Sequence, residues 1–297
     1  MPRRDILLAI LVAVVWGCNF VAIRWGVDEV APLLLSALRY LFAAVPAVFL
    51  VRPPKVRLSL LVGYGFAIGV GQFGLLYAAI GLGMPAGLAS LVAQLQAFFS
   101  IGLAAVMLGE RPSRAQLAGA AVAFLGIATI ASERLAGTTL IPLLMTVAAA
   151  LSWAFGNVIT KRAGRVDMLA FVVWSSLVPP IPLYLLSLVL EGPEALPEAL
   201  GALTWLGAGS LVYMAYVSTL VGYGLWSALL ARHPSNLVTP FSLLVPVVGI
   251  AGGALLLGET VTPIEMAGSA LVFAGLVLAV LRRSRAAPRA APAGPAG

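Results

Sequence analysis

Ten long apolar runs, joined by short polar segments, account for nearly the whole chain. Each run is close to the roughly 20 residues that a helix needs to cross a bilayer, and longer than a strand of a membrane barrel. The pattern therefore predicts an all-α membrane protein with ten transmembrane helices. The predicted helices are Ile6–Ile23, Val30–Val51, Leu58–Ile80, Ala86–Leu108, Ala115–Ala131, Leu140–Thr160, Met168–Leu190, Ala202–Leu230, Ser235–Leu257 and Pro263–Leu281.

The positively charged residues fall in every second segment between the runs. Cytoplasmic loops of membrane proteins are enriched in lysine and arginine, so this alternation predicts that both termini lie in the cytoplasm. The same distribution explains the net charge of +7. We expect no nucleic-acid partner, because the charges sit between apolar runs, as expected of cytoplasmic loops. The predicted cytoplasmic segments hold 15 of the 18 basic residues: Arg3, Arg4, Arg52, Lys55, Arg57, Arg111, Arg114, Lys161, Arg162, Arg165, Arg232, Arg282, Arg283, Arg285 and Arg289.

The two halves of the chain repeat a sequence motif. The segment that begins at Gly109 reads GERPSRAQLAGAAVAFLG, and the one that begins at Gly258 reads GETVTPIEMAGSALVFAG. Each half holds five apolar runs, an odd number, so the second half enters the membrane from the opposite side. The sequence thus predicts two inverted five-helix repeats, an arrangement with which secondary transporters expose a central site to either side in turn.

We expect one membrane domain over residues 1–297, with the first repeat at about 5–131 and the second at about 139–283. The last residues, 284–297, are basic and rich in Ala, Pro and Gly, a composition that cannot bury enough apolar surface to fold. This C-terminal tail is therefore predicted to be disordered.

The composition and the set of reactive residues argue against an enzyme. The chain is 61% hydrophobic and 10% charged, far from the roughly half apolar and quarter charged residues of soluble proteins. Cys18 is the only cysteine, so no intrachain disulfide is possible and we expect neither a metal nor a cofactor. The apolar runs hold no Ser/His/Asp, Cys/His or paired-carboxylate set, and the single histidine, His233, falls in a predicted cytoplasmic loop. We therefore predict a transporter, with a solute channel as the alternative.

Four motifs stand out along the chain: Trp16-Gly17-Cys18-Asn19-Phe20, Ala37-Leu38-Arg39-Tyr40, Gly109-Glu110 and Gly258-Glu259. By these motifs the chain resembles EamA-type members of the drug/metabolite transporter superfamily, and among them the bacterial aromatic amino-acid exporters. The resemblance covers the chain from about Asp5 to Leu281. In one respect the chain departs from this pattern, because the fourth run has Ala97 where the ninth has Pro246, a residue that could hinge a helix.

Arg39 is the one ionisable residue predicted to lie deep in a membrane helix, where such residues are costly and commonly functional. All Asp and Glu residues fall in loops or at helix ends, so no buried carboxylate is available for proton coupling. A single arginine among neutral residues fits a neutral or zwitterionic solute that leaves down its own gradient. Two roles for Arg39 are open: an ion pair with a substrate carboxylate, or structural contacts with helix-end carbonyls and aromatic faces.

Neutral polar and aromatic side chains complete the predicted substrate site. The Trp16–Asn19 pair is echoed by Trp153–Asn157 in the second repeat, and we expect the two pairs to meet at the centre. Tyr213 and Tyr216 begin a stripe that continues to Tyr223 at helical spacing, which predicts a cavity wall. The predicted substrate-binding residues are Trp16, Asn19, Arg39, Gln72, Tyr77, Ser90, Gln94, Trp153, Asn157, Tyr213 and Tyr216.

These features together predict a secondary transporter of the bacterial inner membrane that works by alternating access. The expected cargo is amino acids, including aromatic and other large neutral ones, and related small metabolites, all exported without a proton-coupling carboxylate. The alternatives are an exporter of other neutral or cationic metabolites or drugs, and a solute channel. The expected partners are the small-molecule substrate and membrane lipids, and a monomer is plausible because nothing in the sequence defines an oligomer.

Overall fold

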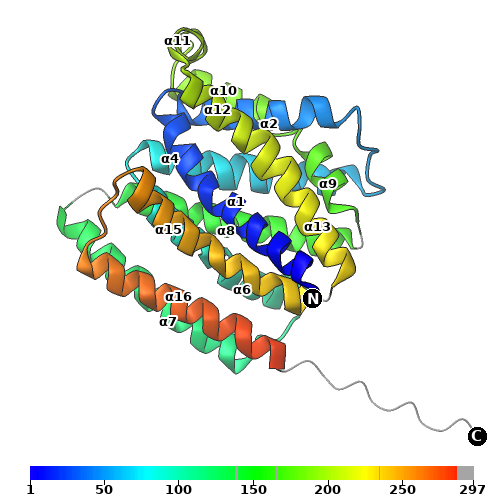
Figure 1. The fold of residues 1–297 in the computed structure, drawn as a ribbon, viewed down its shortest axis with the longest axis vertical. Helices are drawn as coiled ribbons and strands as arrows, with labels where there is room; N and C mark the ends of the chain where they lie inside the picture. The colour runs from blue at the N-terminus through cyan, green and yellow to red at the C-terminus, as the bar shows by residue number, and fades with distance from the viewer. Residues whose placement is uncertain (138–139, 165, 234, 286–297) are drawn as a thin grey trace, which may run out of the picture.

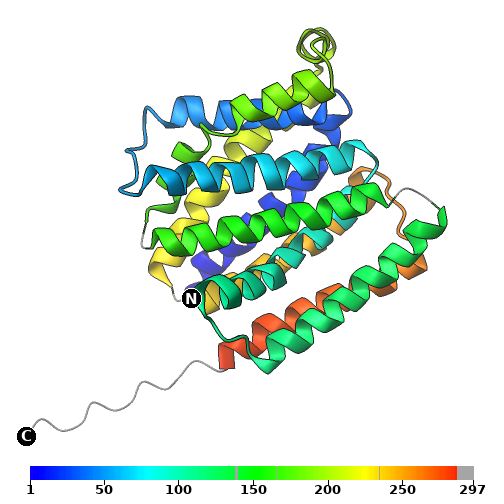
Figure 2. The ribbon, with the colours of Figure 1, turned by 180° about the vertical axis from the view of Figure 1, so that it is seen from behind.

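The computed structural model describes residues 1–137, 140–164, 166–233 and 235–285, and these residues form helices without a β-strand. The helices line up as rods that cross the molecule from one end face to the other (Figures 1 and 2). The first two residues of the predicted C-terminal tail, 284 and 285, belong to the last helix, which ends at Arg285, and the rest of the tail lies outside the described residues.

Each of the ten predicted apolar runs contains a helical rod. The first-half rods are α1 (Arg3–Val27), α2 (Pro32–Ala47), α3–η1–α4 (Leu58–Tyr64, Gly65–Gly74, Leu75–Gly81), α5–η2–α6 (Ala86–Val92, Ala93–Leu95, Gln96–Leu108) and α7 (Arg114–Gly137). The second-half rods are α8 (Ile141–Ala163), α9 and α10 (Met168–Ser175, Pro180–Leu190), α12–η3–α13 (Trp205–Val212, Tyr213–Val221, Gly222–Arg232), α14–η4–α15 (Ser235–Val238, Thr239–Leu243, Leu244–Leu256) and α16 (Pro263–Arg285).

Seven helices in the described part of the chain are long and apolar enough to cross a membrane. Three apolar helices are shorter, at Pro32–Ala47, Pro240–Leu256 and Pro263–Ala279. Several boundaries differ from the prediction by a few residues, and α7 continues to Gly137 instead of ending at Ala131. The run predicted to start at Ala202 begins as a helix at Trp205, and the preceding loop contains an additional short helix, α11 (Ala195–Ala202). Helix α12 starts late because Thr204 caps it, accepting hydrogen bonds from the amides of Leu206 and Gly207.

The two halves interrupt the α-helix in the same places. The third and eighth rods each contain a π-helical stretch, η1 and η3, and the fourth and ninth rods each contain a 3₁₀ stretch, η2 and η4. The proline in η4 and the nearby Pro246 have no counterpart in η2, where Ala97 follows, yet η2 forms. The change of helix type in the fourth rod therefore does not depend on a proline.

The packing repeats as well. Helix α1 packs on α15 and on the α12–η3–α13 rod, while α8, its counterpart, packs on α6 and on the α3–η1–α4 rod. Helices α7 and α16 pack mainly on each other and form a separate pair at the bottom of both ribbon views (Figures 1 and 2). They approach to backbone contact, because a Cβ added at Gly119 would lie 2.6 Å from the carbonyl oxygen of Gly275.

Candidate functional site

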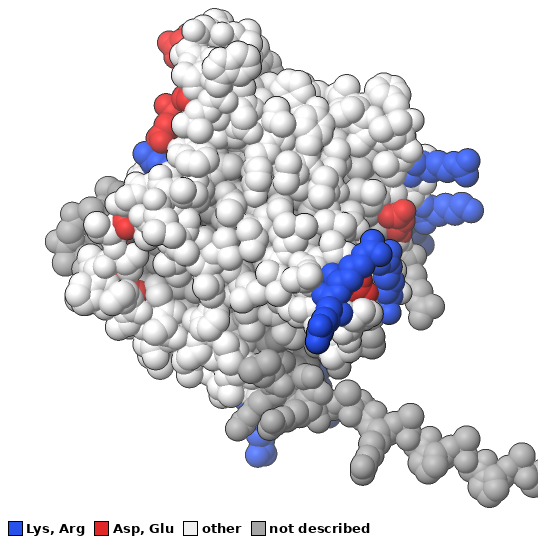
Figure 3. Space-filling model, viewed as in Figure 1, with Lys and Arg blue, Asp and Glu red and all other residues white. Residues whose placement is uncertain are grey.

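The charged residues divide between the two end faces of the bundle. In Figure 3 most of the visible Lys and Arg atoms lie along the right and lower edges, and acidic atoms gather at the upper left. We call the first the basic face, and the opposite one the glutamate face, after three residues that bind helix ends there: Glu29, Glu191 and Glu259.

Each of these three glutamates caps the start of a helix that is distant in sequence. Glu191 accepts hydrogen bonds from the backbone amides of Leu33 (2.7 Å) and Leu34 (3.2 Å) at the start of α2. Glu259 accepts bonds from the amides of Ala86 (2.5 Å) and Gly87 (2.9 Å) at the start of α5. A carboxylate is favourable here because the first amides of a helix have no partner within the helix and carry partial positive charge.

Glu29 holds the start of α12. It accepts a bond of 2.9 Å from the amide of Thr204 and one of 2.6 Å from the Thr204 hydroxyl. These donors favour the carboxylate form, so the Thr204 hydroxyl, with help from the Thr204 and Gly207 amides, lowers the pKa of Glu29 below its usual value. The glutamate face is thus tied together by bonds between rods.

The basic face is joined by charged side chains instead. Asp5 at the start of α1 lies 2.6 Å from His233 Nε2 and 3.9 Å from the Arg232 guanidinium, both at the end of α13. Lys161 Nζ lies 2.8 Å from Glu110 Oε1, and both side chains are about half exposed. These pairs agree with the prediction that the acidic residues lie at helix ends.

Arg39 is 2% exposed and surrounded by neutral groups. Its guanidinium donates to the Thr219 hydroxyl from Nη2 (3.1 Å) and more weakly from Nε (3.4 Å), and to the Tyr77 hydroxyl from Nη1 (3.0 Å). Its Cζ lies 4.0 Å from the centroid of the Phe73 ring, a cation–π distance. The predicted contact with aromatic faces is therefore present, while the predicted helix-end carbonyl partners are replaced by hydroxyls.

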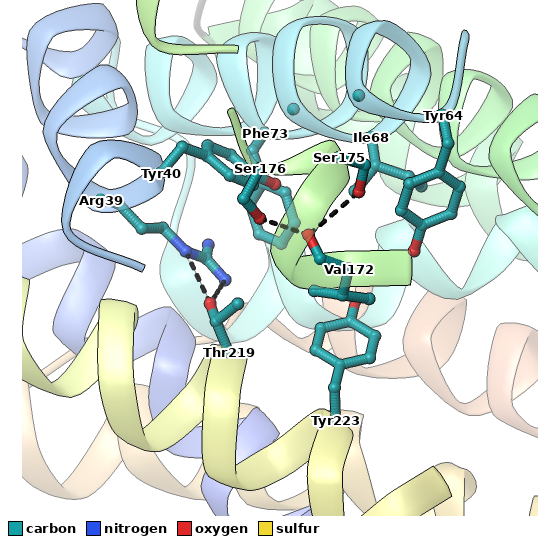
Figure 4. Close-up of a pocket in the computed structure, with 12 residues that line it drawn as sticks. Arg39, Tyr40, Tyr64, Ile68, Phe73, Val172, Ser175, Ser176, Thr219 and Tyr223 are labelled. Atoms are coloured by element: carbon teal, nitrogen blue, oxygen red, sulfur yellow. Dashed lines mark hydrogen bonds between the residues drawn. The ribbon is translucent and has the colours of Figure 1, made fainter. Parts of the chain in front are cut away.

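A small cavity lies beside Arg39, with a free volume of about 10 Å³, about enough for one water molecule. Figure 4 shows Arg39 and Thr219 on one side of it and Tyr64 and Tyr223 on the other, with Ser176 between. Its wall comes from both π-helical stretches, from α2, and from the end of α9 where the seventh rod breaks before Pro179.

The predicted tyrosine stripe does not form a single wall. Tyr223 lines the Arg39 cavity, whereas Tyr213 donates to the carbonyl of Val15 and lines a separate cavity of about 220 Å³ beside Cys18 and Trp205. The prediction assumed α-helical spacing, but Tyr213–Val221 is π-helical, with i→i+5 hydrogen bonds, and this changes which residues share a face.

The Trp16 and Asn157 motifs bind different neighbours. Trp16 donates to the carbonyl of Ser218 (3.1 Å) and packs against the rings of Tyr223 and Trp226. Asn157 donates to Gln96 Oε1 (2.6 Å) and to the Ser100 hydroxyl (2.9 Å) on α6. The two motifs are therefore held in separate clusters, because each packs against rods of the opposite repeat.

The other predicted residues are buried to different degrees. Asn19 and Gln72 are about 5% exposed, and the side-chain oxygen of each lacks a hydrogen-bond partner within the described structure. Ser90 donates to the carbonyl of Gly87, and Gln94 is buried in η2. Trp153 and Tyr216 are partly buried.

Sequence reasoning missed three kinds of residue in the Arg39 cluster. Thr219 was overlooked because a threonine in an apolar run is an ordinary packing residue, although it lies within the tyrosine stripe. Phe73 carries no polar signal. Ser175 and Ser176 lie three residues or more before the Pro179–Pro180 pair, and their place next to prolines, which commonly kink a helix, was the available clue.

This helical fold, with its long apolar helices and charged end faces, is that of a multi-pass membrane protein. The chain belongs to the EamA-like transporter family, whose model matches it twice, over residues 3–132 and 140–281, and it is therefore a transporter rather than an enzyme. The double match confirms the predicted family and the internal duplication.

Two relatives and one solved structure extend this result. The chain is 48% identical to a probable amino-acid metabolite efflux pump of Salmonella typhimurium, over 94% of this chain and 96% of that protein. It is 31% identical to a probable terminal-alkyne amino-acid exporter of Streptantibioticus cattleyicolor, over 91% of each. A crystal structure with 18% identity matches with a TM-score of 0.63 over 98% of this chain and 100% of the other, which shows a shared fold.

Proposed function

We propose that this protein exports amino acids, including aromatic and other large neutral ones, and related small metabolites across the bacterial inner membrane. The observation that supports this most is a buried cation with neutral hydrogen-bond partners and an aromatic wall, in a chain similar over its whole length to probable exporters of amino-acid metabolites. Such a site suits a zwitterion with an apolar side chain.

The proposed topology has ten spans in two inverted repeats, with both termini in the cytoplasm. The charge asymmetry supports it, because 15 of the 18 basic residues fall in the segments assigned to the cytoplasmic side. Reporter fusions after Ser284 and within residues 52–57 should both report a cytoplasmic location. A periplasmic signal from either fusion would overturn the ten-span topology.

We propose that the protein alternates between two conformations, in which the fourth and ninth rods close the transport path at one end face or at the other. Here their halves at the glutamate face, α5 and α15, pack closely, while α6 packs on α8. A Cβ at Gly87 would lie 3.0 Å from the Ile250 Cα, and Glu259 binds across the contact. Exchange of the two repeats would open this contact and close its counterpart at the basic face.

The predicted site residues are proposed to line the path between these closures. Arg39 and Tyr77 form one cluster and Asn157 another, and the unpartnered oxygens of Asn19 and Gln72 leave two buried amides able to accept bonds from a solute. The ring-bearing candidates Trp16, Trp153, Tyr213 and Tyr216, with Ser90 and Gln94 beside them, supply the apolar and polar parts of this lining.

Counterflow in proteoliposomes tests the proposal. Purified full-length protein should accumulate labelled phenylalanine only when unlabelled amino acid is inside, the flux should saturate, and collapse of a pH gradient should leave the initial rate nearly unchanged. A panel that includes cationic drugs separates the alternative cargo. Linear flux without trans-stimulation would indicate a channel and contradict the carrier.

A further inference from the structure

We propose that the Arg39 cavity is the subsite that binds the carboxylate of the transported solute. The inference rests on the proposed export of amino acids and adds to it the chemical group that the protein must recognise. It starts from the charge balance of the site, because a cation in a membrane interior is costly unless an anion or full hydrogen bonding offsets it.

The guanidinium of Arg39 has more N–H donors than its hydrogen bonds to Thr219 and Tyr77 use. A guanidinium carries five N–H groups, and the contacts with Thr219 and Tyr77 use three of them. One N–H on each terminal nitrogen is left, and these two nitrogens are the pair that binds a carboxylate bidentately. Among the described residues, the groups around the guanidinium are hydroxyls and rings, so the charge itself is not neutralised.

The partners of Arg39 hold it in place without competing for an anion. Thr219 and Tyr77 are themselves fixed, since the Thr219 hydroxyl donates to the Met214 carbonyl (2.8 Å) and the Tyr77 hydroxyl donates to the Met214 sulfur (2.9 Å). The Phe73 ring covers one face of the guanidinium at 4.0 Å. The cation is therefore oriented in advance, which lowers the ordering cost of binding.

The wall of the cavity is built where backbone can rearrange. It takes Gly65 and Gly69 from one π-helical stretch, Thr219 from the other, and Ser176 from the break between α9 and α10. Irregular helix turns are common at functional sites, and their spare hydrogen-bonding positions allow small shifts. In this conformation the space is about 10 Å³, so a carboxylate enters only when these segments separate.

The side chains beyond the guanidinium fit the rest of an amino acid. The rings of Tyr40, Tyr64 and Tyr223 face the same space, and they offer apolar surface to a side chain and hydroxyls to an ammonium group. Ser175 and Ser176 both donate to the Val172 carbonyl, so their oxygens remain available as acceptors. The site thus suits a carboxylate solute whose side chain is apolar.

The experiment compares an acid with its amide on the wild-type protein. 3-Phenylpropionate and 3-phenylpropionamide have the same ring and the same length, and differ in the carboxylate. The acid should inhibit phenylalanine counterflow at a concentration at least about tenfold lower than the amide, the gain expected for a bidentate charged pair. Equal inhibition by the two compounds overturns the proposal without any variant.

Variants then place the discrimination at Arg39. Acid and amide should inhibit counterflow by R39Q at equal concentrations. Counterflow by R39K, which keeps the charge but loses the forked pair of donors, should be only slightly more sensitive to the acid than to the amide. The control R24K changes a helix-end arginine that pairs with Asp28, and it should keep the wild-type ratio. A wild-type ratio in R39Q overturns the proposal.

A binding readout separates this inference from the proposed function. If no amino acid is transported, the export proposal fails, while the melting temperature of the purified protein with acid or amide still tests the subsite. The acid should raise the melting temperature and the amide should not. In the last arm of the experiment, isethionate replaces chloride in the buffer. If chloride raises the melting temperature of the protein and the acid does not, the cavity is a site for inorganic anions and the proposal is overturned.

Discussion

The Gly109–Glu110 and Gly258–Glu259 junctions occupy matched positions in the two repeats, so the repeats can be compared there. Both glycines have a positive φ, +69° and +65°. Both glutamate amides reach back to the preceding helix, Glu110 to the carbonyl of Ala104 at 3.2 Å and Glu259 to that of Gly253 at 3.0 Å. The local sequence is the same, and so is the helix end that it forms.

The carboxylates of the two junctions bind different partners. Glu259 reaches across to the amides that start α5, whereas Glu110 pairs with the exposed Lys161 on α8. Backbone geometry is therefore dictated by a few neighbouring residues, while the side-chain partner depends on which rod has come close. The two repeats therefore share the same local backbone at this junction but differ in how their rods contact one another.

The strongest test of the comparison is to obstruct the closed contact. In G87V the added side chain would meet the Ile250 backbone and the Glu259 carboxylate, and overpacking of this kind costs about 1–3 kcal/mol. The initial rate of counterflow should fall by roughly fivefold or more. The matched control is G102V on the other half of the same rod, where an added Cβ meets nothing within 4 Å. Equal losses in both variants would contradict a special role for this contact.

A smaller difference is expected between the two carboxylates. E259A removes a cap on two backbone amides, so unfolding free energy should drop by about 1 kcal/mol. E110A removes an exposed ion pair, which is worth about 0–1 kcal/mol, and should change little. Melting temperatures of the two variants, measured in the same detergent, check the order. An equal or larger loss in E110A would remove the asymmetry.

The smallest expected effect concerns pH at the glutamate face. The folded pKa of Glu29 is lowered, so its contribution to stability is present above the unfolded value of 4.5 and is lost as the pH falls through the folded value. The melting temperature of the wild type should therefore approach that of E29Q as the pH is lowered below about 4.5. The two curves should separate again near neutrality. A constant separation would show that the charge of Glu29 is not involved.

Much of the fold could be predicted from the sequence because a helix that crosses a membrane needs a long, continuous run of apolar residues. Each predicted apolar run contains helix in the described part of the chain, and the matched Gly–Glu motifs predicted the duplication that the family model finds. The additional helix α11 and the late start at Trp205 were missed, since a helix of eight residues in a loop is too short to stand out as an apolar run.

The candidate site could be predicted only in part. Arg39 stood out because a charge is conspicuous in an apolar run, and its burial follows from that position. Its hydrogen bond to Thr219 joins residues in opposite repeats, and such partners depend on packing that no local pattern encodes. The tyrosine stripe divides between two cavities for a related reason: a π-helical stretch changes which residues share a face, and periodicity arguments assume an α-helix.

The paired π-helical stretches also bear on how the duplicated chain arose. A π turn closes its hydrogen bond over one residue more than an α turn, so the stretch marks a rod that accommodates additional chain within its span. It occurs in the third rod of one half and in the corresponding eighth rod of the other. The simplest history that places the feature in both halves is one in which it preceded the duplication of the chain.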